Sequence, residues 1–172
     1  KNEIHTNGIT GSTGAGVKPS STSHFSWRNN NLSIYKAFTH QHLIEINRTI
    51  KQLQPDFTQE LNFLPLRGDF ARGIFVSSYT ECDLSAEELT ALYKEFYKDA
   101  AFTFVMDANL DLKQVVNTNK AIVHVEKHGN KVLAISAIDN LLKGASGQAV
   151  QNFNLMFGLD ETCGLKLKSV AF

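Results

Sequence analysis

The stretch AIVHVEKHGNKVLAISAI, residues 121–138, decides the fold class. Two apolar segments, 121–126 and 132–138, flank the turn residues His128, Gly129 and Asn130, a pattern typical of a β-hairpin. A hairpin joins antiparallel neighbours, and the elements predicted around it follow no strict strand-helix alternation. We therefore expect an α+β domain with a largely antiparallel sheet and helices packed on one face.

Periodicity predicts the remaining elements. Apolar residues at three- and four-residue steps predict a helix from a cap at Thr39 to a stop at Pro55. Ser85 with Glu88 forms a capping box for a helix over 84–98, and a last helix is expected over 139–157, ending at Gly158. Further strands are predicted at 3–10, 61–66, 73–80, 102–106 and 115–116, and an ordered loop at 20–31.

Composition limits the class of protein. The 172 residues, 42% of them hydrophobic, suffice for one domain with its own core. Seventeen basic and 17 acidic residues cancel, which argues against nucleic acid or an anionic membrane as a partner. Cys82 and Cys163 are too few for a disulfide framework, so a reducing, cytoplasmic location is expected. No apolar run approaches the roughly 18 residues of a membrane span.

Glycine-rich residues follow the first predicted strand, with Gly8, Gly11 and Gly14 at three-residue steps. This spacing looks superficially like a dinucleotide fingerprint, but Pro19 and a Ser/Thr-rich loop follow where that motif needs a helix. Two interpretations remain open. The segment is either a turn between two elements, or a loop whose backbone N–H groups approach a ligand beside the Thr13 hydroxyl.

The densest cluster of titratable groups runs from Tyr35 to Glu45 and contains His40 and His42. A histidine at a helix start suits proton transfer, because the positive helix end lowers its pKa and keeps the ring neutral near pH 7. The His-x-His spacing with Glu45 also permits a metal site. The alternative is a surface helix that begins with two polar residues and carries no chemistry.

The last predicted helix has two conflicting features. A core stripe is expected from residues at helical spacing, namely Leu142, Ala145, Ala149, Phe153 and Met156. Gly144 and Gly147 nevertheless lie inside the helix, where each costs up to about 1 kcal/mol relative to alanine. Another backbone or a flat ligand is therefore expected to approach, with Gln148 available to hydrogen-bond it; the alternative is tight packing on the sheet.

Four segments together resemble a known family: Gly11–Gly16 (GSTGAG), His40–Ile46 (HQHLIEI), Arg72–Phe75 (RGIF) and above all Ala137–Asp160. They are similar to the C-terminal part of N-acetyl-gamma-glutamyl-phosphate reductases of arginine biosynthesis. The resemblance implies a domain like the C-terminal domain of glyceraldehyde-3-phosphate dehydrogenase. Residues 1–172 would form the substrate-binding and oligomerisation domain, and an N-terminal NADP-binding Rossmann domain would be absent from this chain.

The resemblance also implies a reaction. An N-acyl-glutamyl phosphate would be reduced to the semialdehyde through a thioester on a cysteine that would lie before Lys1, so this chain alone would be a truncated, inactive fragment. His40, or else His42, would be the acid/base catalyst. Tyr35 and Glu45 would orient the histidine or the substrate, and Arg72 would hold a substrate carboxylate.

Thr13, Gly14 and Gln148 would line the nicotinamide side of the NADP site, and no metal is implied. Gln41 and Trp27 depart from the family's pattern and leave open which acyl group the substrate carries. The expected partners are the acyl phosphate, the chain's own N-terminal domain and further copies in a homodimer or homotetramer. The competing hypothesis is a stand-alone metal-binding, anion-binding or oligomerisation module of the same fold.

Overall fold

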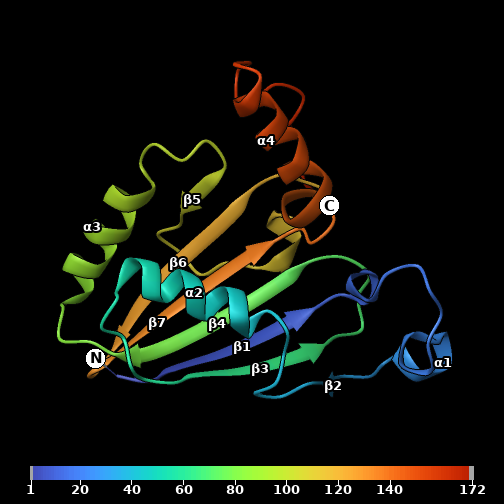
Figure 1. Cartoon of the computed structure of the whole chain (residues 1–172), viewed down its shortest axis with the longest axis horizontal. Coiled ribbons are helices and arrows are strands. Elements are labelled where there is room, and N and C mark those ends of the chain that lie inside the picture. Colours follow the sequence, from blue (N-terminus) through green and yellow to red (C-terminus); the bar gives the residue numbers. More distant parts are fainter. Residues whose placement is uncertain (1, 171–172) are drawn as a thin grey trace.

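The computed structural model describes residues 2–170 and contains one seven-stranded sheet in the order β2-β3-β1-β4-β7-β6-β5 (Figure 1). The β1–β4, β2–β3, β4–β7 and β6–β7 pairs are antiparallel, while β1–β3 and β5–β6 are parallel. The predicted α+β class with a largely antiparallel sheet is therefore confirmed. The strands are β1 Ile4–Thr10, β2 Ser33–Ile34, β3 Leu61–Arg67, β4 Ile74–Glu81, β5 Thr103–Val105, β6 Ala121–His128 and β7 Lys131–Ile138.

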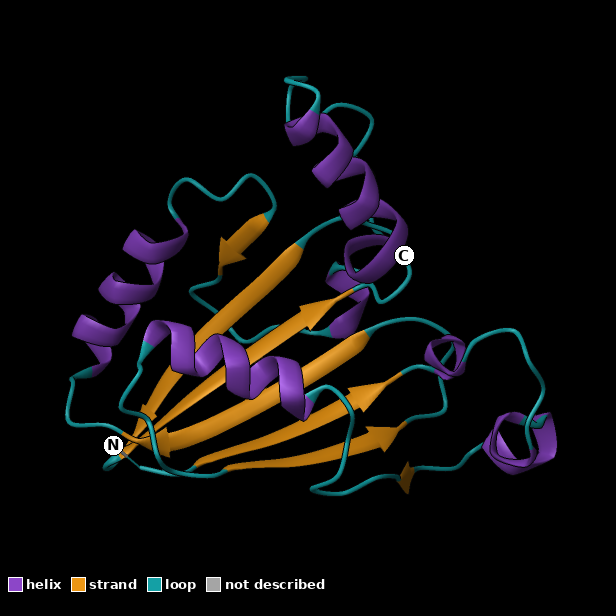
Figure 2. Cartoon of the chain, viewed as in Figure 1, coloured by secondary structure: helices purple, strands orange, loops and turns teal. Residues whose placement is uncertain are grey.

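The predicted hairpin is β6 and β7, paired from Ala121 opposite Ile138 to His128 opposite Lys131. Gly129 and Asn130 form the two-residue turn, and Gly129 has a φ of 57°, a conformation that glycine adopts without strain. The helices are α1 Phe25–Arg28, α2 Leu43–Leu53, α3 Ala86–Tyr97 and α4 Gly147–Met156, the last preceded by one π-helical turn at Leu142–Ser146 (Figure 2).

The capping box of α3 is confirmed. Ser85 Oγ accepts a hydrogen bond from the Glu88 N–H at 3.2 Å, and the Glu88 carboxylate accepts one from the Ser85 N–H at 2.8 Å. Hydrogen bonds to the Glu88 carboxylate, first from the Ser85 backbone N–H and then from the Ser85 side chain, lower the pKa of Glu88 because they favour its ionised form. The sequence signal succeeds here because this cap depends only on two residues that are three positions apart.

Three predicted elements were wrong. Val115–Val116 is not a strand: Val115 is fully buried and ends a 3₁₀ turn at Leu112–Gln114. The helix expected from Thr39 begins at Leu43, because the backbone of residues 36–38 turns through left-handed conformations at Lys36 and Phe38. The loop expected over 20–31 contains α1 and a 3₁₀ turn at Ser21–Ser23.

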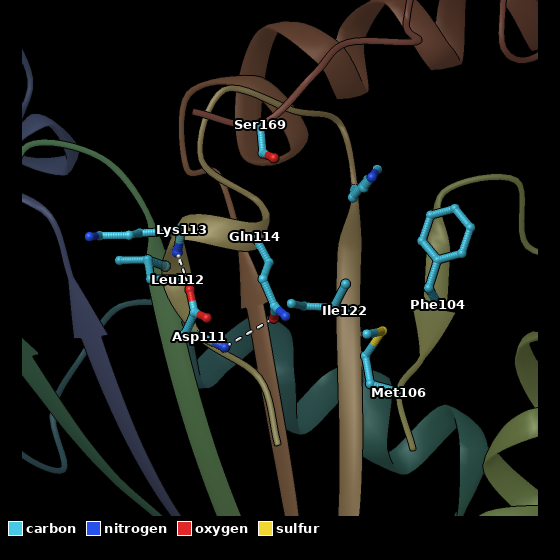
Figure 3. Close-up of a pocket in the computed structure, with 9 residues that line it drawn as sticks. Phe104, Met106, Asp111, Leu112, Lys113, Gln114, Ile122 and Ser169 are labelled. Atoms are coloured by element: carbon cyan, nitrogen blue, oxygen red, sulfur yellow. Dashed lines mark hydrogen bonds between the residues drawn. The ribbon is translucent and has the colours of Figure 1, made fainter. Parts of the chain in front are cut away.

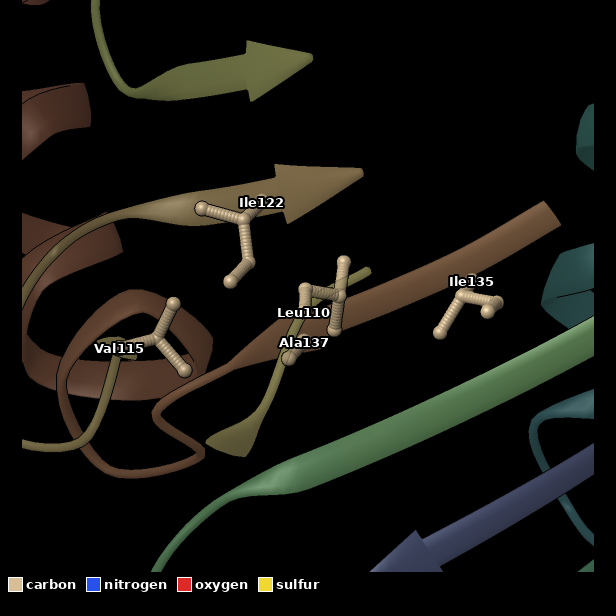
Figure 4. Close-up of a cluster of buried hydrophobic side chains, with 5 residues drawn as sticks. All are labelled: Leu110, Val115, Ile122, Ile135 and Ala137. Atoms are coloured by element: carbon tan, nitrogen blue, oxygen red, sulfur yellow. The ribbon is translucent and has the colours of Figure 1, made fainter. Parts of the chain in front are cut away.

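Both faces of the sheet carry apolar clusters. Leu110, Val115, Ile122, Ile135 and Ala137 form one of them, where the segment 106–120 covers β6 and β7 (Figure 4). Leu89 of α3 packs with Val125 and Val132 in the other. Ile122 and Val125 point to opposite faces because strand side chains alternate. The two clusters therefore form separate cores on either side of one sheet.

The helices α2 and α3 lie on the same face. Phe63 of β3 and Val125 of β6 belong to one row of paired residues that crosses the sheet through β1, β4 and β7. Side chains of directly paired residues lie on the same face of a sheet. Phe63 contacts the His40 ring just before α2, and Val125 packs against α3. The prediction of helices on one face is confirmed for these two helices.

The core stripe predicted for the last helix was wrong. The helix begins at residue 142, not 139, and Ala145, Ala149, Phe153 and Met156 are exposed. Figure 1 shows α4 extending away from the sheet, so its apolar side chains have no sheet surface to cover. The helical spacing was correct, but spacing alone does not show which part of a protein the apolar face contacts.

The close contact expected at Gly147 is made by another part of the same chain. A Cβ added there would overlap Asn119 Oδ1, and it would also lie 2.8 Å from the Leu142 carbonyl oxygen. Asn119 is buried and donates from Nδ2 to the Leu165 carbonyl oxygen at 2.8 Å, so it cannot move without breaking that bond. Tight internal packing therefore explains Gly147, and no flat ligand is needed.

We expect Gly147→Ala to lower the free energy of unfolding by about 1–3 kcal/mol, because the new methyl group must displace Asn119. Gly144→Ala is the matched control. The nearest atoms to its Cβ are 3.6 Å away, so it should be neutral or slightly stabilising. Urea unfolding of the two variants would measure both values, and equal stability of the two would contradict this account.

Candidate functional site

A histidine cluster lies between β2 and α2. The segment from Tyr35 to Phe38 runs beside β3, because the Tyr35 N–H donates to the Pro65 carbonyl oxygen at 3.1 Å and the Phe38 N–H to that of Phe63 at 3.0 Å. The backbone then turns through the left-handed residues Lys36 and Phe38. This turn brings His40 back over β3.

Four rings meet at this point. The His40 ring lies 5.6 Å from that of Tyr35, 4.7 Å from that of His42 and 5.5 Å from that of Phe63, measured between centroids, each contact edge-to-face. His40 is partly buried, whereas His42 is exposed and serves as the N-cap residue of α2. His40 is therefore the less solvent-exposed of the two histidines.

The electrostatics of His40 favour its neutral form. Partial burial lowers its pKa first, and the neighbouring charges of His42 and Lys36 lower it further. The direction agrees with the expectation from sequence, but the cause is burial and nearby cations. His40 Nδ1 accepts a hydrogen bond from the His42 N–H at 3.3 Å, which places the proton of the neutral ring on Nε2.

Glu45 does not join this cluster. It lies in the first turn of α2 with an exposed side chain, and within residues 2–170 no hydrogen bond or ion pair connects its carboxylate to His40 or His42. The structure thus brings Tyr35 to His40 but leaves Glu45 at the surface. In the same range, no group of three or more His, Cys, Asp or Glu residues is placed to hold a metal ion.

A second polar cluster lies where β1, β4 and β7 meet their loops. Arg72 donates from Nη2 to the Asp139 carboxylate at 3.0 Å, and Asp139 also accepts from the N–H groups of Asn117, Leu141 and Leu142. Asp139 is completely buried, while the Arg72 side chain keeps 30% of its surface exposed. One nitrogen of Arg72 is therefore committed to an internal ion pair.

The carboxylate of Asp139 stays ionised. Burial raises its pKa, but the hydrogen bonds from the N–H groups of Asn117, Leu142 and Leu141 and from Arg72 lower it by more. Asp139 thereby anchors the start of the π-helical turn and the guanidinium of Arg72. The sequence does not single it out, because two of its partners, Asn117 and Arg72, lie 22 and 67 residues away.

Asn140 connects two of the predicted site loops. Its Oδ1 accepts from the Gly73 N–H at 2.6 Å, and its Nδ2 donates to Thr13 Oγ1 at 3.0 Å. The Thr13 hydroxyl in turn donates to the Ala71 carbonyl oxygen. Thr13 and Arg72, 59 positions apart in sequence, are thus brought into one network through residues 139–140.

The predicted cofactor residues fit a dinucleotide poorly by themselves. The Thr13 hydroxyl is engaged inside the chain, and only Gly14 and Gln148 remain exposed. Gly14 donates its own N–H to the Gly11 carbonyl oxygen, so the loop is a closed 3₁₀ turn rather than an open cradle. Two exposed positions do not make an NADP site.

An open cavity of about 970 Å³ lies elsewhere, between β5, β6 and the 3₁₀ turn at Leu112–Gln114. Figure 3 shows Gln114 directed toward Ile122, with Phe104 and Met106 on the opposite side. Because Ile122 points away from the face that carries α3, this cavity and the histidine cluster are on opposite faces of the sheet. None of the predicted site residues lines it.

No helix within residues 2–170 is both long enough and apolar enough to cross a bilayer.

Several known proteins are similar to this chain. It is 62% identical over 170 residues to the N-acetyl-gamma-glutamyl-phosphate reductase of Parabacteroides distasonis, which covers 99% of this chain and 53% of the relative. The reductase of Flavobacterium johnsoniae is 62% identical over 171 residues, again with 99% and 53% covered. The chain therefore spans about half the length of the curated relatives it matches.

Solved structures share the fold. Aspartate semialdehyde dehydrogenase II from Vibrio cholerae has a TM-score of 0.66 at 14% identity, covering 91% of this chain and 55% of that one. A probable aspartate-semialdehyde dehydrogenase from Pseudomonas aeruginosa has a TM-score of 0.68 at 12% identity, covering 90% and 55%. The family model for the dimerisation domain of semialdehyde dehydrogenase matches residues 1–140. This chain therefore belongs to the semialdehyde dehydrogenase family, as its dimerisation domain.

Proposed function

We propose that this chain is the C-terminal part of an NADP-dependent reductase that converts an N-acyl-gamma-glutamyl phosphate to the N-acyl-glutamate semialdehyde in arginine biosynthesis. The observation that carries the proposal is 62% identity to a reductase of that name over 99% of the chain. The chain would supply the substrate-binding and oligomerisation domain. The half of the parent enzyme that binds NADP would lie outside these 172 residues.

His40 is the proton donor and acceptor in this proposal. Its lowered pKa keeps the ring neutral at pH 7, and its Nδ1 is occupied by the His42 N–H, so Nε2 is the atom that exchanges a proton with substrate. Tyr35 and Phe63 hold the ring from two sides. Arg72, fixed at one nitrogen by Asp139, is proposed to use its exposed edge for a substrate carboxylate.

The nucleophilic cysteine would lie in the other part of the parent enzyme. Cys82 packs beneath α3 beside the cluster of Leu89, Val125 and Val132, and Cys163 is an exposed residue after α4. No ring or hydrogen-bond contact joins either thiol to His40 in residues 2–170. When bound, NADPH would supply the hydride, and the described residues would position the substrate and move the proton.

The exposed apolar side chains of α4 support a second domain as a partner. Phe153, Leu155, Met156 and Phe157 are each more than half exposed, although an isolated domain normally buries such side chains. We propose that the parent's N-terminal domain covers this face. The family description as a dimerisation domain supports assembly with a second copy of the protein.

The test uses the full-length parent protein, in which residues 1–172 are preceded by the missing half. It should oxidise NADPH when given N-acetyl-gamma-glutamyl phosphate. Cys82→Ser and Cys163→Ser variants should keep kcat/KM within about twofold, since neither thiol is part of the proposed chemistry. Loss of turnover in either variant, with folding intact by circular dichroism, would contradict the assignment of the nucleophile to the other half.

A further inference from the structure

Arg67 lies beside the histidine cluster, at the end of β3. Phe63, Pro65 and Arg67 alternate onto one face of that strand, and Phe63 contacts the His40 ring. The Arg67 Cζ lies 4.8 Å from the centroid of the Tyr35 ring, and that ring also contacts His40. A guanidinium and a neutral imidazole thus flank the same tyrosine ring.

The hydrogen-bonding capacity of Arg67 is unused. Its Nε is buried without a partner, and in the part of the chain that the structure describes, its guanidinium makes no hydrogen bond or ion pair. Arg72 is paired with Asp139, and Arg28 donates to oxygens of Thr22, Asn31, Ser33 and Arg67. Of the three, Arg67 is the one left without an acceptor.

Positive charge gathers around the same point. Lys36 follows Tyr35 directly and donates to the uncharged Gln41 amide, and both Lys36 and His42 lower the pKa of His40. Asp69, two positions after Arg67, accepts from the Asn30 N–H at 2.6 Å, and within residues 2–170 it makes no hydrogen bond or ion pair with the guanidinium. An unpartnered guanidinium in such surroundings favours binding of an anion.

We propose that Arg67 binds an oxyanion of the substrate, a phosphoryl or a carboxylate group, beside His40. The inference rests on the proposed function and adds a residue to it. Tyr35 supports the guanidinium through its ring, and the free N–H donors can each bind one of two oxygens of either oxyanion. Arg67 is thus a binding residue distinct from Arg72, whose guanidinium is shared with Asp139.

The test compares Arg67→Gln with Arg48→Gln, an exposed arginine on α2, in the full-length reductase. The reverse reaction separates the two sources of oxyanion, because inorganic phosphate and the semialdehyde are independent substrates. If Arg67 binds the phosphoryl group, the KM for inorganic phosphate should rise about 10- to 100-fold in Arg67→Gln. If it binds a carboxylate, the KM for the semialdehyde should rise by that factor instead.

Either outcome supports the proposal, provided that Arg48→Gln leaves both KM values unchanged. Arg67→Lys should recover part of the affinity, because it restores the charge but not the planar fork. Unchanged KM values for both substrates in a folded Arg67→Gln enzyme would overturn the inference and leave the proposed function intact. No turnover by the unsubstituted enzyme would instead reject the proposed function, and the inference with it.

Discussion

Replacing His40 by alanine in the full-length reductase is expected to lower kcat/KM for the acyl phosphate by about 10²- to 10⁴-fold, the usual contribution of a positioned acid/base group. His40 is the partly buried member of the pair and is held between the Tyr35 and Phe63 rings. His42→Ala should have a smaller effect, because His42 is exposed and contributes its backbone N–H to His40. Steady-state kinetics of the two variants would give both values.

The pH profile provides a second readout of the same residue. Burial and the charges of His42 and Lys36 lower the pKa of His40. The limb of the kcat/KM profile against pH that is assigned to His40 should therefore have an apparent pKa below the ordinary value of 6.5. That limb should disappear in His40→Ala. Full activity in the His40→Ala, His42→Ala double variant would remove both histidines from the mechanism.

Replacing Asp139 by alanine is expected to lower the free energy of unfolding by about 3–5 kcal/mol. The substitution leaves the N–H groups of Asn117, Leu141 and Leu142 without an acceptor and Arg72 without its counterion. Urea unfolding would measure the loss. Asp107→Ala is the matched control, since Asp107 is an exposed partner of Lys94 and its removal should change stability little.

The effect of Asp139 should depend on pH with a defined sign. Its pKa in the folded chain is lowered below 3.8, so its stabilisation is fully present above that value and is lost as pH falls through the folded pKa. The difference between the unsubstituted chain and Asp139→Ala should therefore be constant near neutrality and shrink in acid. A difference that grows as pH falls would show that Asp139 is not held as the ionised acceptor.

The parts of the fold that depend on neighbouring residues could be predicted from sequence. The hairpin follows from alternation around Gly129 and Asn130, and the start of α3 follows from Ser85 with Glu88. Val115 was mistaken for a strand residue because it is apolar and β-branched, whereas its burial comes from packing on Ile122 and Ala137. Tertiary contacts of this kind leave no local signature.

The candidate site was predictable only in part for the same reason. His40 and Tyr35 are close in sequence, and a titratable cluster was visible there. The contacts that order them come from Phe63 and Arg67, more than 20 positions away on β3. Gly147 was recognised as a position of close approach, but its neighbour Asn119 lies 28 positions earlier and could not be identified from spacing.

The most direct test of the central proposal is to assay residues 1–172 and the full-length parent protein side by side for NADPH oxidation with N-acetyl-gamma-glutamyl phosphate. The isolated chain should show no turnover above the uncatalysed rate, because the proposed cysteine and the proposed NADP-binding domain both belong to the other half of the parent protein. The full-length protein should turn over. Reduction of the acyl phosphate by residues 1–172 alone, or none by the full-length protein, would contradict the account.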